Sequence, residues 1–305
     1  MKEEDFLQII KTIIGDKYIG DDCAYLKDLG IVISQDNLVE DVHFSLKYMT
    51  PYDIGYKSAM VNLSDIASSG GIPKYITVGL SLPKHISKEF VKDFYNGLTD
   101  ALDEVEIIGG DITGAEKIMI SVTAIGIDRD RKISSRKNAK TGQVVVTSGP
   151  HGSSAGGLIL LQQGEKEKNV LIDAHICPKA QTKFAQKIAE NIKEDYAMMD
   201  SSDGLADAVF KIAKASNKTL VLDFNKIIFD KELKEQFPKN YKDMILYGGE
   251  DYQIISTIPK ELADYLNLNI IGKVEDYDNT DVKIINYGER DLNISDLENC
   301  YNHFE

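Results

Sequence analysis

The order of apolar and polar positions along the chain predicts alternating strands and helices. In the first half, short apolar runs at 31–33, 76–82 and 105–108 predict strands. Alternation of apolar and polar residues over 118–124 predicts a further, half-buried strand. Apolar residues recur at helical spacing over 88–102, so a helix is expected there.

A longer helix is predicted from Thr50-Pro51 to Gly70-Gly71, because a hydroxyl cap and proline suit a helix start and glycine suits its end. Two stripes of side chains should follow its surface. The apolar stripe, expected to face the core, is Tyr56, Met60, Leu63 and Ala67. The small polar stripe, expected to lie open to a ligand, is Ser58, Asn62, Asp65 and Ser69.

A charged, non-periodic stretch at 129–142 separates the two halves, and we predict domains at 1–135 and 136–305. Helices are then expected after the Ser/Gly-rich stretch 148–154, whose helix start should offer free N–H groups, and at Pro178 and Gly204. Further strands are predicted at 143–147, 196–199, 219–224, 253–258 and 269–274. The predicted fold class is therefore α+β, with two α/β-type domains built on mixed sheets.

Composition excludes some classes of protein. The net charge of −14 argues against a nucleic-acid partner, because phosphate backbones attract basic surfaces. No apolar run approaches the roughly 18 residues that a membrane helix needs. The three cysteines are far apart, and the acidic N-terminus has no secretory apolar segment. We therefore expect a cytoplasmic protein without disulfides.

Short acidic motifs beside glycine or serine recur along the chain. They are Gly20-Asp21-Asp22, Ser34-Gln35-Asp36, Asn62-Leu63-Ser64-Asp65, Gly109-Gly110-Asp111, Asp200-Ser201-Ser202-Asp203-Gly204 and Gly248-Gly249-Glu250-Asp251. Any one of them could simply be a turn. If they converge, they would form an acidic cup for several Mg²⁺ ions, because hard cations prefer carboxylate oxygens. A polyphosphate is the ligand that such a cup would suit.

The common nucleotide-binding fingerprints are absent: the chain has neither the P-loop lysine motif nor a G-x-G-x-x-G after a strand. If ATP binds, metal ions and backbone amides must therefore hold its phosphates. Arg136 stands out among the cations near the middle of the chain, because arginine can bind a phosphate through two hydrogen bonds. His43 follows an acidic stretch and is either a structural histidine or a substrate contact.

Eight ordered motifs along nearly the whole chain resemble the thiamine-monophosphate kinase family, a branch of the aminoimidazole-ribonucleotide-synthetase-like superfamily. The motifs are Gly20-Asp21-Asp22-Cys23-Ala24, Ser34-Gln35-Asp36-Asn37-Leu38-Val39, His43-Phe44, Tyr56-Lys57, Val61-Asn62-Leu63-Ser64-Asp65, Gly109-Gly110-Asp111, Ser202-Asp203-Gly204-Leu205 and Gly248-Gly249-Glu250-Asp251-Tyr252. The ending, Tyr301-Asn302-His303-Phe304, also resembles that family.

The resemblance implies a function and an assembly. ATP and Mg²⁺ would convert thiamine monophosphate to thiamine diphosphate, the last step in making that cofactor, by direct in-line transfer without a catalytic base. The chain would form a homodimer through a barrel built from the N-terminal sheets.

Site residues follow from the motif positions. The implied metal ligands are Asp22, Ser34, Asp36, Asp65, Asp111, Asp200 and Asp203. The implied ATP-binding residues are Gly110, Asp111, Arg136 and Ser202, and the implied substrate contacts are His43, Glu250 and Tyr301. Gln35 departs from the family pattern, where threonine is usual, so its role at the metal site is open.

Other interpretations remain open at this point. A purine-pathway synthetase or a selenophosphate synthetase would use similar acidic turns, although the His43 region and the C-terminal aromatic residues favour the thiamine enzyme. A protein that binds divalent cations without catalysis would also carry such carboxylates. ATP consumption that depends on thiamine monophosphate would separate these functions.

Overall fold

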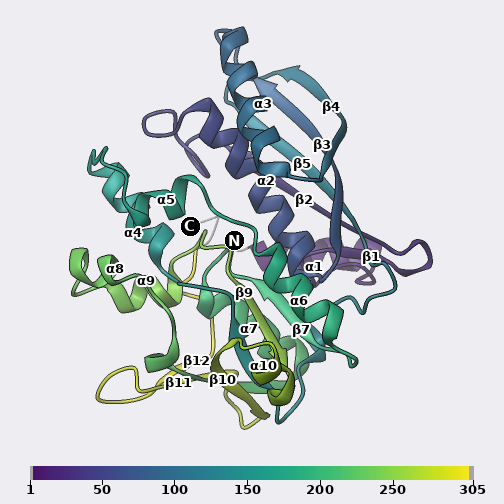
Figure 1. Cartoon of the computed structure of the whole chain (residues 1–305), viewed down its shortest axis with the longest axis vertical. Coiled ribbons are helices and arrows are strands. Elements are labelled where there is room, and N and C mark those ends of the chain that lie inside the picture. Colours follow the sequence, from purple (N-terminus) through teal and green to yellow (C-terminus); the bar gives the residue numbers. More distant parts are fainter. Residues whose placement is uncertain (1–2, 302–305) are drawn as a thin grey trace.

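Two mixed β-sheets organise the chain, one in each half (Figure 1). The structure is a computed structural model that describes residues 3–301. Figure 1 shows the first sheet with α2 and α3 at one end of the molecule and the second sheet with α4 to α10 at the other. This arrangement confirms the predicted α+β class with two mixed sheets.

The first sheet has five strands in the order β1-β2-β5-β3-β4. Only β3 and β4 run parallel, and the other neighbours are antiparallel. Its strands are β1 (Ala24–Leu26), β2 (Ile31–Val39), β3 (Ile72–Leu82), β4 (Glu106–Gly114) and β5 (Met119–Ile127).

The second sheet has seven strands in the order β12-β11-β8-β10-β6-β9-β7. Here β8 and β11 are the parallel pair. The strands are β6 (Val144–Thr147), β7 (Ala197–Asp200), β8 (Lys218–Asp223), β9 (Ile254–Ile258), β10 (Asn269–Asp276), β11 (Val282–Ile285) and β12 (Leu292–Ile294). The gap between β5 and β6 contains the expected boundary at 135/136, and the two domains stay a prediction.

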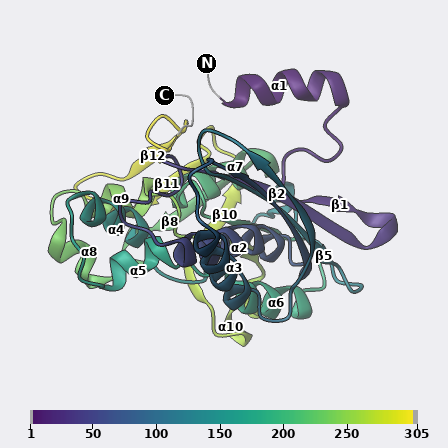
Figure 2. The ribbon, with the colours of Figure 1, turned by 90° about the horizontal axis from the view of Figure 1, so that it is seen from above.

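Helices cover both sheets, while α1 stands apart from the body in Figure 2 and exposes Ile9, Ile10, Ile13 and Ile14. No helix in residues 3–301 is long and apolar enough to cross a membrane. The helices are α1 (Glu3–Ile14), α2 (Pro51–Ser68), α3 (Lys88–Leu102), α4 (Ser153–Gln162), α5 (Val170–Ile176), α6 (Thr182–Asn191), α7 (Leu205–Ser216), α8 (Lys231–Gln236), α9 (Tyr241–Tyr247) and α10 (Lys260–Tyr265).

Helix α2 lies between the two halves. Thr50 and Asp53 form a reciprocal capping box at its start, with Pro51 in the first turn, as the sequence predicts. The helix packs against β2, β3 and β5 of the first sheet, and against α5, α6 and β7 of the second half. The prediction of an open polar stripe was therefore wrong for Ser58, Asn62 and Ser69, which are buried, whereas Asp65 is only half-buried.

Two strands and one helix differ in extent from the predictions. Strand β2 does not end at Ser34 but continues to Val39, because it pairs with β5 over its whole length. Strand β4 includes Gly109-Gly110-Asp111, which pair with β3 instead of forming a turn. The helix expected at Pro178 begins at Thr182. The local sequence pattern did not predict where β2 and β4 end, because a strand continues as far as a neighbouring strand pairs with it.

Helices α2 and α3 approach each other through two glycines. A Cβ atom on Gly55 would lie 1.9 Å from the carbonyl oxygen of Phe94, and one on Gly97 would lie 1.9 Å from that of Tyr52. These distances leave no room for a side chain, so the helix contact requires glycine at both positions.

We expect Gly97→Ala to lower the free energy of unfolding by about 1–3 kcal/mol, because the added methyl group overpacks the contact between α2 and α3. Helix propensity alone predicts the opposite sign, since alanine is favoured over glycine by about 1 kcal/mol inside a helix. Urea denaturation measures the change. Gly288→Ala is the control, because a Cβ atom at Gly288 meets nothing within 4 Å and Gly288 lies outside both helices.

Candidate active site

Three carboxylates from distant parts of the chain meet where the two halves join. Asp22 precedes β1, Asp65 lies on α2, and Asp200 ends β7. One carboxylate oxygen from each lies within 4.8 Å of the others. The fold therefore brings three of the predicted metal ligands together, and we call them the aspartate cluster.

Serine hydroxyl groups hold each carboxylate of the aspartate cluster. Ser34 on β2 donates to Asp65, and Ser64 on α2 donates to Asp200. One turn further along α2, Ser68 donates to Asp22 at 2.6 Å. Sequence reasoning missed Ser64 and Ser68 as site residues, although their spacing of four places them on one side of the helix.

The buried carboxylate of Asp200 has one oxygen that could bind a ligand. Its side chain is 1% exposed, and its Oδ1 atom has no hydrogen-bond partner in that part of the chain. Burial and the neighbouring Asp22 raise the pKa of Asp200 to about 7. Burial, followed by Asp36, Asp200 and Asp22, raises the pKa of Asp65 well above its ordinary value. A divalent cation among these oxygens would relieve both effects.

Arg136 connects the aspartate cluster to the start of the second half. Its guanidinium pairs with Asp22, and its backbone N–H donates to Asp21 at 2.8 Å. Burial lowers its pKa, but Asp22 and Asp21 raise it more, so the net shift is upward. Arg136 therefore carries a fixed positive charge beside the carboxylates, which suits a bound phosphate.

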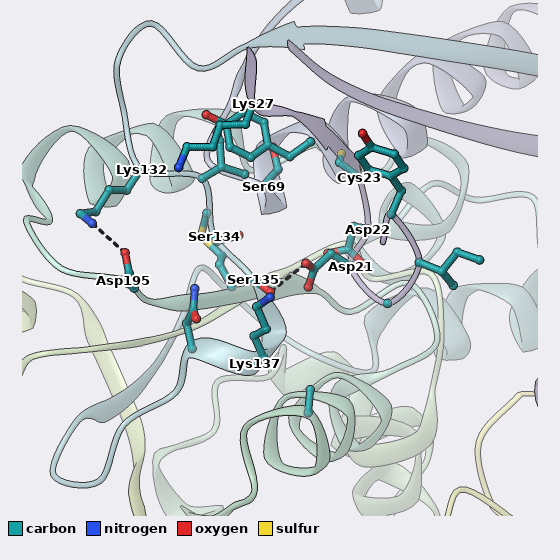
Figure 3. A pocket seen from close by; sticks show the side chains of 18 of the residues that line it. Asp21, Asp22, Cys23, Lys27, Ser69, Lys132, Ser134, Ser135, Lys137 and Asp195 are labelled. Carbon is teal, nitrogen blue, oxygen red and sulfur yellow. Dashed lines mark hydrogen bonds and ion pairs between the residues drawn. The ribbon is translucent and has the colours of Figure 1, made fainter. Parts of the chain in front are cut away.

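A pocket of about 850 Å³ opens on the Asp22 side (Figure 3). In Figure 3, Ser135 donates to Asp21 and Lys132 pairs with Asp195 on its walls. Lysine side chains Lys17, Lys27 and Lys137 also line this pocket. Its mixture of cations and hydroxyl groups can accept an anionic ligand next to the aspartate cluster.

A second pocket, of about 580 Å³, opens on the Asp65 side. It is lined by residues from both halves that the sequence predicted to bind metal ions, ATP or substrate. They are Asp36, His43, Asp65, Ser202, Asp203, Glu250 and Tyr301. Asp203 also pairs with Lys211 at 3.3 Å. Tyr301 is the last described residue, and the predicted family ending at 302–304 lies outside the described part of the chain.

The loop that carries Glu250 is fixed from both sides. Lys57 on α2 has no exposed surface, and its Nζ lies 3.0 Å from Glu250 Oε1. His175 on α5 lies 3.4 Å from Glu250 Oε2 through its Nδ1 atom. No sequence pattern marked His175 as a site residue, and Lys57 appeared only within a family motif.

The start of helix α4 is capped by an acidic side chain, so two of the N–H groups that were predicted to be free already have a partner. The Asp251 carboxylate accepts from the backbone N–H groups of Gly152 and Ser154. An acidic side chain from a distant loop caps this helix instead of a ligand. The segment Gly248-Gly249-Glu250-Asp251 is therefore a structural junction as well as part of the pocket wall.

Gly110 and Asp111 are placed differently from the other predicted residues. Both lie on the edge strand β4 and are exposed, and Asp111 is outside the aspartate cluster. A Cβ atom at Gly110 would lie 2.0 Å from the carbonyl oxygen of Val78, so the pairing of β3 with β4 requires glycine there. The metal and ATP roles of Asp111 stay predictions.

Comparison with known proteins identifies the family. The chain is 34% identical to the thiamine-monophosphate kinase of Aquifex aeolicus over 286 residues, covering 90% of this chain and 92% of that protein. It is also 34% identical to the enzyme of that name from Bacillus subtilis over 308 residues, covering 94% and 93%. The chain belongs to the thiamine-monophosphate kinase family. Residues 20–127 also match the family model for the N-terminal domain of AIR synthase related proteins.

Solved structures agree with this assignment. The structure described as AaThiL complexed with AMPPCP and TMP superposes with a TM-score of 0.89 at 31% identity, covering 99% of this chain and 97% of that one. A HypE–HypF complex superposes with a TM-score of 0.80 at 18% identity, covering 95% and 98%. The second likeness extends only to the fold.

We expect the metal-free protein to lose stability as pH rises from about 4 to 7. The pKa of Asp200 is about 7 in the folded chain and near 3.8 when unfolded, so in this window only the folded state keeps the proton. Added Mg²⁺ should stabilise the protein more at pH 8 than at pH 5.5, because the ion competes with protons for these oxygens.

Thermal melting at both pH values, with EDTA or with Mg²⁺, measures this linkage. Asp200→Asn should flatten the pH dependence and reduce the stabilisation by Mg²⁺. A melting temperature that is independent of pH and of Mg²⁺ in the unaltered protein would contradict a cation site at the aspartate cluster.

Proposed function

We propose that this protein transfers the γ-phosphoryl group of ATP to thiamine monophosphate, which gives ADP and thiamine diphosphate. The observation that carries the proposal is the position of the aspartate cluster between two pockets. Asp22 lines the larger pocket and Asp65 the smaller one. The relatives are named thiamine-monophosphate kinases, and the AaThiL structure is described with an ATP analogue and TMP.

Mg²⁺ is the cation that we propose for the aspartate cluster. Carboxylate and hydroxyl oxygens form the donor set, and the unpartnered, buried Oδ1 of Asp200 is available to a ligand. Asp22, Asp65 and Asp200 would hold ions directly, with Asp36 and Asp203 beside them and Ser34 already bonded to Asp65. Bound Mg²⁺ neutralises phosphate charge and aligns the reacting groups.

The chain's own residues position two anions. The acceptor is a phosphate oxygen, and a phosphomonoester with a second pKa near ~6 is mostly dianionic at neutral pH. No general base is therefore required. Repulsion between the two phosphates is the obstacle, and Arg136 brings a permanent positive charge to the side of Asp22.

We assign ATP contacts to Gly110, Asp111, Arg136 and Ser202, and thiamine contacts to the smaller pocket. There, His43, Glu250 and Tyr301 come from three separate segments. Glu250 can accept from an amino group or face a cationic ring, and the Tyr301 ring can add a cation–π contact of roughly 0.5–2 kcal/mol.

We also propose a homodimer formed through the first sheet, in a cytoplasmic protein. Strand β4 is the last strand of that sheet, and all its residues are exposed. Ile108 and Ile112 are 53% and 65% exposed, so the edge offers unpaired backbone together with apolar side chains. A second copy of the sheet would cover both. The free cysteines suit a reducing compartment.

Formation of thiamine diphosphate tests the reaction directly. ADP release should depend on both thiamine monophosphate and Mg²⁺, with product identified by chromatography. Asp65→Asn should reduce turnover at least about 100-fold while the fold persists, because it removes one ligand charge and keeps the shape. Asp111→Asn should do the same if the edge strand contributes to the site. Near-normal turnover of Asp65→Asn at saturating Mg²⁺ would refute the role of the aspartate cluster.

Light scattering tests the assembly. The unaltered chain should have the mass of a dimer at micromolar concentration, and Ile112→Lys should shift it towards the monomer, because a lysine in the covered edge would be desolvated. Tyr265→Lys is the matched control, since Tyr265 is 78% exposed and belongs to helix α10 in the other half. A monomeric unaltered chain would disprove the dimer.

A further inference from the structure

The carboxylate of Glu250 is held by two buried groups that the reaction itself does not require. We propose that Lys57 and His175 are positioning residues that fix Glu250 as the recognition group for the cationic, amino-bearing ring system of the substrate. The inference rests on the proposed function, because thiamine monophosphate supplies that ring system. It assigns to two further residues the task of orienting a substrate contact.

Lys57 provides the first contact. Its side chain is fully buried, whereas that of Glu250 is 25% exposed and lines the smaller pocket. The Lys57 ammonium group lies 3.0 Å from Glu250 Oε1 and donates to the backbone carbonyl of His43 at 3.2 Å. The Lys57 ammonium group thus contacts two proposed substrate-binding residues, His43 from the first half of the chain and Glu250 from the second. A buried lysine requires such partners, since an unpaired buried charge is strongly unfavourable.

His175 provides the second contact. The side chain is 2% exposed, and its Nδ1 lies 3.4 Å from Glu250 Oε2 and 3.0 Å from the Ser154 hydroxyl oxygen. A carboxylate oxygen only accepts hydrogen bonds, so the neutral tautomer with the proton on Nδ1 suits this place. The Nε2 atom has no partner among the described residues. The polar contacts of the ring are therefore concentrated on the side of Glu250.

The backbone at Glu250 is fixed as well. Its φ angle is +65°, in the left-handed region that non-glycine residues seldom adopt. Its N–H donates to the carbonyl of Ser202 at 2.6 Å, and the next residue, Asp251, caps helix α4. A non-glycine residue kept in this conformation by its surroundings is typical of a functional position.

The remaining hydrogen-bonding capacity of Glu250 points to its ligand. An ionised carboxylate has about four lone-pair sites on two oxygens. The Lys57 ammonium group lies against Oε1 and the His175 ring against Oε2, and the partly exposed carboxylate also lines the pocket. A ligand that donates from an amino group, or that carries positive charge, fits such an oriented anion, whereas an anionic phosphate is repelled from it.

Substitutions at both positions test the proposal. Binding of thiamine monophosphate is measured by isothermal titration calorimetry without ATP, and the Michaelis constant for ATP by steady-state kinetics. His175→Leu and Lys57→Met should each weaken binding of thiamine monophosphate at least about tenfold, the usual scale for a contact to a charged group. The Michaelis constant for ATP should stay within about twofold. His175→Asn, which keeps an N–H near the Nδ1 position, should recover most of the affinity.

His151→Leu is the matched control. His151 is also a fully buried histidine of the second half, but it contacts Thr147 instead of Glu250, so its loss should leave thiamine monophosphate affinity unchanged. The decisive comparison uses Glu250→Gln. If Lys57 and His175 act through the carboxylate, neither substitution should weaken binding further in that background.

The proposal would be overturned if Lys57→Met or His175→Leu weakened binding of thiamine monophosphate further in the Glu250→Gln background. Equal effects on thiamine monophosphate and ATP would also overturn it, as would an unchanged affinity of His175→Leu for thiamine monophosphate. If Lys57→Met has no cooperative melting transition, the His175 variants decide alone. A wild-type protein that makes no thiamine diphosphate would instead disprove the proposed function, so the two failures are distinguishable.

Discussion

Mutual repulsion among buried carboxylates is the constraint around which this structure is organised. Asp22, Asp65 and Asp200 lie within a few ångströms of one another, and the last is almost fully buried. Such a group is unfavourable for a protein without a counter-charge. Hydroxyl groups from Ser34, Ser64 and Ser68, together with the Arg136 guanidinium, offset part of this cost. The remaining cost makes the cluster a place where a divalent cation is strongly favoured.

Helix α2 explains how the carboxylates can meet at all. It passes between the two halves, so successive turns of one helix can contact loops from distant parts of the chain. Asp65 lies on it directly, while Ser64 and Ser68 reach Asp200 of the second half and Asp22 of the first. Lys57, two turns earlier, holds the loop of Glu250. A rigid, buried helix with small polar side chains thus aligns two pockets.

The arrangement shows how a protein can handle phosphates without a P-loop. In that motif a glycine-rich loop and a lysine surround the phosphate groups. Here the helix start that resembles such a loop is occupied, because Asp251 caps it. In the proposed function, phosphate binding is instead assigned to cations held by carboxylates and to Arg136. This chemistry suits a reaction in which two anionic phosphates must approach each other, because the negative charge of both has to be neutralised.

The sequence by itself determined the element types, the α+β class and most of the acidic residues that converge at the candidate site. Capping chemistry at Thr50-Pro51 and the alternation of strand residues are local properties, so they are visible in the chain. Periodicity also placed Asp65 on a polar stripe of its helix. Motif order pointed to the family, although no single acidic motif could.

Only the tertiary structure decided what covers each surface and which residues meet. Most of the polar stripe of α2 is buried because the second half packs on it. Strands β2 and β4 extend through polar residues because neighbouring strands pair with them. His175 has no sequence signal, since its partner Glu250 lies 75 positions away along the chain. Periodicity reports which way a side chain faces within its own element. It carries no information on what lies opposite, because contacts between distant segments are fixed only when the chain folds.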